Sequence, residues 1–152
     1  MKTTVRTLVS TALLALSAPV LADSQEVLID GVWARATVGA NRPAAVYIEF
    51  RNTGANDLKL TGIQTDIAER AEVHMTETDE NGVSTMKPAG EISLPSGENV
   101  EFQPGGLHIM LMNLSKPLIE GDSFKIRFDF DDGGSLPATV RVLGIAARGP
   151  EN

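Results

Sequence analysis

Short stretches in which apolar and polar residues alternate run along most of the chain, separated by groups of Gly, Pro, Asn and Asp. In residues 44–51 (AAVYIEFR), Val46, Ile48 and Phe50 fall at every second position and therefore share one face of a strand. The pattern predicts strands at residues 26–37, 44–51, 58–64, 71–77, 83–88, 91–94, 98–102, 107–114, 123–130 and 138–143. Only residues 67–73 could instead form a single helical turn. Such short strands, with connections too short for crossover helices, indicate an all-β protein, an antiparallel sandwich or barrel.

Two of the predicted strands form a hairpin. Residues 71–77 and 83–88 flank the polar turn Thr78-Asp79-Glu80-Asn81-Gly82. This hairpin would carry His74 on one arm and Met86 on the other.

The first 22 residues have a different character. Lys2 and Arg6 precede a mostly apolar run at residues 8–18, and small residues end the segment at Ala22. This arrangement predicts a secretory signal peptide at residues 1–22 and a mature domain at residues 23–152. The apolar run is too short to cross a membrane.

The charge of the mature domain restricts its partners. The whole chain has 13 Lys and Arg against 20 Asp and Glu. Residues 1–22 hold two of the basic residues and none of the acidic ones, so the mature domain has a net charge of −9. An acidic domain argues against nucleic acid and anionic lipid as partners, and we expect no insertion into the membrane. The chain has no cysteine, so it forms no disulfide.

The candidate chemistry lies in the central part of the chain. The only two histidines are His74 and His108, and all internal methionines (Met75, Met86, Met110 and Met112) lie between residues 74 and 112. Imidazole and thioether groups together form a ligand set that suits Cu(I). This grouping predicts a copper site.

Strand alternation selects among these candidates. In residues 107–112, His108, Met110 and Met112 share one face of a strand, whereas the Leu and Ile residues between them share the other, the natural core face. His74 and Met75 point to opposite faces, so only one of them is expected to reach a given metal. We favour His74 and keep Met75 open as an alternative ligand. Met112 could serve packing alone.

The spacing of these residues resembles the H(M)x10Mx21HxM signature of the periplasmic copper chaperone family known as PCuAC. His74-Met75, Met86 and His108-x-Met110 match it, and Ala45–Asn52, Pro104–Leu111 and other blocks resemble the family between Val27 and Val142. The resemblance implies a cupredoxin-like antiparallel β-sandwich of Greek-key type. It also implies His74, Met86, His108 and Met110 as Cu(I) ligands. Some relatives carry a C-terminal His- and Met-rich tail that binds Cu(II), which the last residues here, ARGPEN, do not resemble.

The same resemblance implies a function. The protein would be a periplasmic, non-enzymatic chaperone that carries Cu(I) to an acceptor protein, such as subunit II of cytochrome c oxidase or another assembly factor, for assembly of the Cu(A) centre. We expect it to act as a monomer.

Other classes of function fit the residues less well. A blue-copper electron carrier needs a cysteine thiolate, which this chain lacks. A zinc hydrolase would need a carboxylate such as Glu72 or Glu77 beside both histidines and would leave the methionines without a role. A metal-free or copper-buffering β-sandwich that binds a protein partner remains the alternative to a copper carrier.

Overall fold

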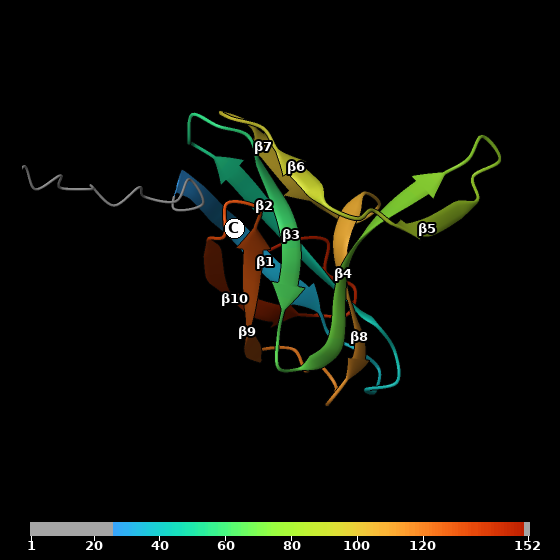
Figure 1. The fold of residues 1–152 in the computed structure, drawn as a ribbon. Helices are drawn as coiled ribbons and strands as arrows, with labels where there is room; N and C mark the ends of the chain where they lie inside the picture. Colours follow the sequence, from blue (N-terminus) through green and yellow to red (C-terminus); the bar gives the residue numbers. More distant parts are fainter. Residues whose placement is uncertain (1–25, 151–152) are drawn as a thin grey trace, which may run out of the picture.

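The computed structural model describes residues 26–150, so the predicted signal peptide lies outside the described residues. Its strands are β1 (Val27–Arg35), β2 (Ala44–Asn52), β3 (Leu58–Gln64), β4 (Ala68–Thr78), β5 (Ser84–Pro88), β6 (Ile92–Leu94), β7 (Asn99–Phe102), β8 (Leu107–Leu114), β9 (Ser123–Phe130) and β10 (Ser135–Leu143) (Figure 1). The described residues contain no α-helix, and the all-β prediction is confirmed. No helix in this part of the chain is long and apolar enough to span a membrane.

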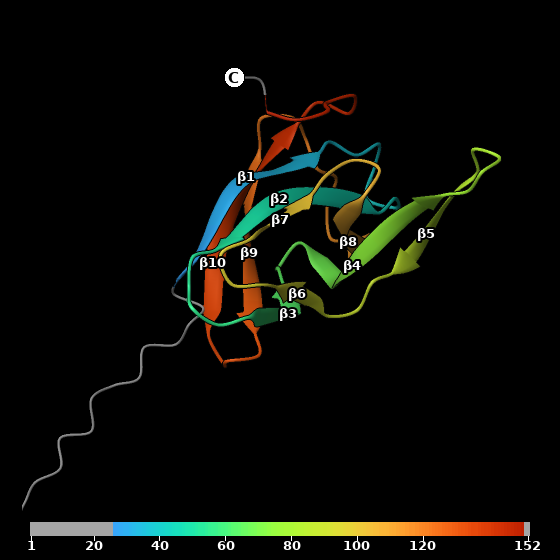
Figure 2. The same cartoon turned by 90° about the horizontal axis from the view of Figure 1, so that it is seen from above.

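The strands follow one another across the sheet in the order β5-β4-β8-β2-β1-β10-β9-β3-β6, with β7 also paired to β2 (Figures 1 and 2). The sheet curls so that strands far apart in this order pack face to face. Phe50 of β2 and Phe128 of β9 meet edge to face at 5.0 Å between ring centroids, although two strands separate β2 from β9 in the sheet. The result is a sandwich-like fold with a single apolar interior.

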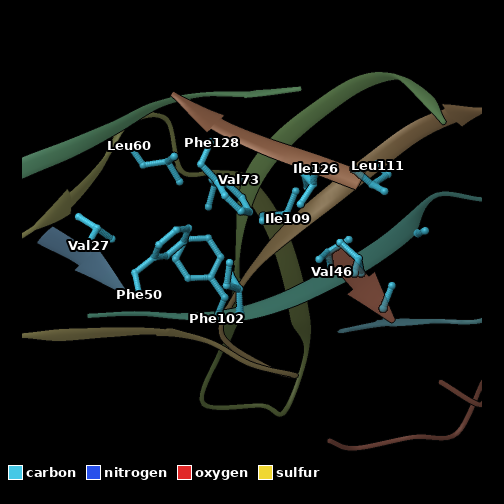
Figure 3. Packing of buried hydrophobic residues seen from close by; sticks show 14 of the residues in the cluster. Val27, Val46, Phe50, Leu60, Val73, Phe102, Ile109, Leu111, Ile126 and Phe128 are labelled. Atoms are coloured by element: carbon cyan, nitrogen blue, oxygen red, sulfur yellow. The ribbon is translucent and has the colours of Figure 1, made fainter. Parts of the chain in front are cut away.

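The core is built from the inward positions that strand alternation predicts. Val46, Ile48 and Phe50 of β2 are each at most 2% exposed, and Phe102 and Phe128 pack against them (Figure 3). Aromatic and β-branched side chains favour this pleated, buried setting. The core therefore forms without the histidines or the internal methionines, which lie outside the cluster of buried apolar residues.

Two local features differ from the sequence-based expectation. Residues 68–73 belong to β4 and not to a helical turn, because they pair with β8, where Ala71 lies opposite Leu111 and Val73 opposite Ile109. One pair of neighbours, β1 and β10, is parallel. Parallel neighbours need a long connection, and here almost the whole domain connects these two strands.

The hairpin of β4 and β5 projects from the body of the fold (Figures 1 and 2). This hairpin was predicted from the sequence and is confirmed, with Thr76 opposite Met86. All five residues of β5 are exposed, and β5 is the last strand at its end of the sheet. The hairpin therefore presents one arm to solvent while β4 stays anchored to β8.

Candidate metal centre

The pairing of β4 with β8 brings the two histidines together. The strands are antiparallel, with His74 directly opposite His108 and Glu72 opposite Met110. Residues directly opposite in such a pair lie on the same face of the sheet. Because Val73 and Ile109 point into the core, the four side chains named here lie on the opposite face.

Met86 reaches this face from β5. It lies opposite Thr76, which alternation places on the same side of β4 as His74. The Met86 side chain is 59% exposed. Residues His74, Met86, His108 and Met110 thus share one face across three adjacent strands, as the predicted ligand set requires.

The two imidazole rings are close and sheltered. Their centroids are 6.0 Å apart with the planes inclined at 49°. His108 is only 5% exposed, and the side chain of His74 is 12% exposed. This separation allows one ion to lie between the rings.

A backbone carbonyl determines which nitrogen of His108 is free. Nδ1 lies 3.1 Å from the carbonyl oxygen of Gly106. A carbonyl can only accept, so Nδ1 carries the hydrogen and donates it, and Nε2 keeps its lone pair for a ligand. The same carbonyl accepts the amide of Thr76, which fixes it against β4. Gly105, whose φ of +88° favours glycine, turns the chain into this position.

His74 has unfilled hydrogen-bonding capacity. Both ring nitrogens are buried, and neither makes a hydrogen bond to any of the described residues. A buried polar group without a partner costs about 1–3 kcal/mol. Nε2 lies 3.5 Å from Glu72 Oε2, which is a weak electrostatic contact and not a hydrogen bond. A ring in this state is suited to bind a metal ion.

Glu72 is itself held by a neighbour on the same face. Arg70 Nη2 and Nε donate to Glu72 Oε1 at 2.6 and 3.2 Å. The hydrogen bond from Arg70 lowers the pKa of the Glu72 carboxyl, with smaller contributions from its charge and from His74, while desolvation acts in the opposite direction. Glu72 is therefore a carboxylate at neutral pH. Alternation places Glu72 on the face of His74, where the sequence alone suggests a role for it only as a zinc ligand.

The remaining methionines have different positions. Met75 lies opposite Leu107, on the core-facing side of β4 and away from His74. Met112 shares the face of Met110, opposite Arg70, and lines an open cleft of about 610 Å³. Among residues 26–150, no group of three or more His, Asp or Glu side chains is placed to hold a metal ion. The soft donor groups on the shared face of β4, β5 and β8 are the two imidazoles and the methionine thioethers.

The arrangement of strands and the His–Met face place the protein in the class of cupredoxin-like domains of the PCuAC type, as the sequence motif predicted. The chain belongs to the LpqE-like family, described as "Putative lipoprotein LpqE-like", whose family model matches residues 27–142. A protein of Leifsonia xyli named "Putative lipoprotein Lxx21020" is 33% identical over 117 residues, which cover 76% of this chain and 69% of that protein.

Solved structures share the fold. The copper-bound PCuAC domain of PmoF2 superposes with a TM-score of 0.65 at 21% identity, covering 78% of this chain and 93% of that chain. The solution structure of Cu(I)-DR1885 from Deinococcus radiodurans has a TM-score of 0.58 at 26% identity, covering 80% of this chain and 83% of that chain. Both relatives contain copper.

Proposed function

We propose that the protein binds a single Cu(I) ion through His74, Met86, His108 and Met110 and carries it to an acceptor protein. The observation that carries this proposal is the shared face of β4, β5 and β8, on which the two imidazoles are 6.0 Å apart. Two neutral nitrogens and two thioethers form a soft set that Cu(I) accepts in a distorted tetrahedral geometry. The copper-containing relatives support the same assignment.

The exposure of the ligands supports transfer over permanent storage. His108 is buried, whereas Met86 is 59% exposed on the projecting hairpin. An acceptor could replace the exposed thioether first while the imidazoles still hold the ion. The copper is thus a cargo that stays accessible to a partner.

Anaerobic titration with Cu(I) against a competing chelator tests the site. The wild-type domain should withdraw one Cu(I) from the chelator, and a variant with Met86→Leu and Met110→Leu should lose this ability. Met75→Leu is the matched control, because Met75 lies on the opposite face of β4. Equal binding by the double variant and the wild type would refute the ligand assignment.

The destination of the copper is a second part of the proposal. We propose a periplasmic location and delivery towards the Cu(A) centre of cytochrome c oxidase, which accords with the exported character of a lipoprotein family. Mixing the Cu(I)-loaded domain with a soluble Cu(A)-bearing fragment should move the metal to that fragment. Retention of copper in the presence of the fragment would favour a buffering role over delivery.

A further inference from the structure

Three side chains follow one another on the copper-facing side of β4. Arg70, Glu72 and His74 occupy alternate positions and therefore point to the same face. Arg70 donates two hydrogen bonds to Oε1 of Glu72, and the other carboxylate oxygen, Oε2, lies 3.5 Å from Nε2 of His74. The carboxylate is thus anchored through one oxygen and directs the other at the imidazole.

Glu72 itself is poorly suited to bind the ion. A carboxylate is a hard ligand, whereas Cu(I) prefers nitrogen and sulfur. Metal-binding histidines commonly donate the hydrogen of their second ring nitrogen to a carboxylate or a carbonyl, which sets the ring orientation. His108 already follows this rule through its Nδ1 and Gly106. His74 has only Glu72 as a charged group close to a ring nitrogen among the described residues.

We propose that Glu72, held by Arg70, is a positioning residue that selects the nitrogen through which His74 binds copper. On loading, Nε2–H of His74 donates to Oε2 of Glu72, and Nδ1 binds the ion. His108 binds the same ion through Nε2, so the two histidines use different ring nitrogens. This inference rests on the proposed function of Cu(I) binding.

The surroundings of the two ring nitrogens support this division of roles. Both ring nitrogens of His74 are buried without a hydrogen-bond partner in the part of the chain that the structure describes, but only Nε2 lies beside a carboxylate. The contact between Nε2 and Glu72 needs only a small movement of a partly exposed carboxylate, whose side chain is 38% exposed, to become a hydrogen bond. One ring nitrogen therefore has an acceptor within reach, and the other is left for the metal.

Three variants separate positioning from a structural role. Glu72→Ala removes the acceptor, Glu72→Gln keeps an acceptor oxygen but not the charge, and Glu77→Gln is the matched control. Glu77→Gln removes one negative charge from β4, as Glu72→Gln does. Glu77 lies on the opposite face of the strand, where it pairs with Lys87. Far-UV circular dichroism confirms that each variant is folded.

The readouts are the Cu(I) affinity and the ¹⁵N chemical shifts of the imidazole nitrogens, which report protonation and metal binding at each atom. In the loaded wild type, Nε2 of His74 should be protonated and Nδ1 metal-bound, with the reverse at His108. Glu72→Ala should bind Cu(I) about 10-fold more weakly or worse and lose the single tautomer. Glu72→Gln should restore the tautomer and most of the affinity, and Glu77→Gln should match the wild type.

Two results would overturn the inference while leaving copper binding intact. One is a loaded wild type in which His74 binds through Nε2, and the other is a Glu72→Ala variant with wild-type affinity and tautomer. A wild-type protein that binds no Cu(I) would instead refute the proposed function, and the positioning role with it.

Discussion

Tyr47, the only tyrosine of the chain, gives a direct test of the structure at the residue scale. It is 5% exposed and packs against Trp33, the only tryptophan, with 4.5 Å between ring centroids and the planes inclined at 37°. Burial raises the pKa of the Tyr47 phenol, and the charge of Arg35 opposes this shift. The neutral phenol therefore stabilises the folded state fully at pH values below about 10, the pKa of tyrosine in the unfolded chain. This stabilisation is lost as the pH rises through the higher pKa of the folded state.

Absorbance of the phenolate should consequently appear only at a pH above that of an unfolded tyrosine. The Tyr47→Phe variant should also lose less folding stability in strong base than the wild type does. A midpoint of the phenolate titration in the folded protein at or below the unfolded value of about 10 would contradict the buried position. The signal is unambiguous because no second tyrosine contributes.

Asn52 is a buried residue whose side chain links the turn between β2 and β3 to the end of β6. It is 1% exposed, donates to the carbonyls of Asn56 and Leu94, both at 2.8 Å, and accepts the amide of Gly54. Asn52→Ala should lower the free energy of unfolding by at least about 2 kcal/mol, because it leaves buried backbone groups without partners. Urea denaturation measures this as a lower midpoint at an unchanged slope. Asn81→Ala, in an exposed turn, should change stability by less than about 0.5 kcal/mol.

Single residues differ in how well the sequence predicts them. That His74 and Met75 point to opposite faces of one strand follows from alternation alone, whereas the placement of His74 on the face of His108 depends on the pairing of β4 with β8. The roles of Asn52 and of the Gly106 carbonyl could not, because each depends on partners that only the folded chain brings near. Alternation alone predicts neighbours on one strand but not contacts across the fold.

At the scale of elements, the turn between β7 and β8 holds the Gly106 carbonyl that contacts His108, a proposed ligand. Gly105 has a φ of +88° and open space around its Cα, so Gly105→Ala should cost about 1 kcal/mol through backbone strain alone. It should also weaken Cu(I) binding, because this turn places the carbonyl that orients His108.

Gly133→Ala is the matched control for this prediction. Gly133, in the turn between β9 and β10, has a φ of +82° and similar open space. Chemical denaturation should show a similar loss of stability for both variants, and chelator competition should show weaker binding for Gly105→Ala alone. Equal Cu(I) affinities in the two variants would show that the turn does not position His108.

The elements themselves were largely predictable, since short stretches such as residues 44–51 and 107–112 show period-two alternation between turn residues. The exceptions have a common physical cause. Residues 68–73 are also compatible with a single helical turn, and they become a strand because β8 offers Leu111 and Ile109 as partners. The parallel pairing of β1 with β10 likewise depends on the closing of the whole domain. Local sequence predicts that a strand forms, and the tertiary fold decides its length and its neighbour.

At the scale of the whole molecule, the proposed copper site lies on a fold whose apolar core is built without its ligands. The buried cluster around Phe50 and Phe128 contains none of the four proposed ligands. Small metal-dependent domains unfold when the metal is removed, but here the apolar core lies between the strands and not around the ion. The empty and the loaded forms should therefore share one fold.

Removal of Cu(I) by a chelator should consequently leave the far-UV circular dichroism spectrum unchanged while it lowers the melting temperature. Binding to the folded state alone stabilises it by about 2.7 kcal/mol when free Cu(I) is 100 times its dissociation constant. The variant with Met86→Leu and Met110→Leu should melt as the copper-free wild type does and show no shift when Cu(I) is added, since neither methionine belongs to the core. Loss of the β-sheet signal on chelation would show instead that copper is a structural component. A protein that unfolds when its copper is removed could not release the ion to a partner and then bind another.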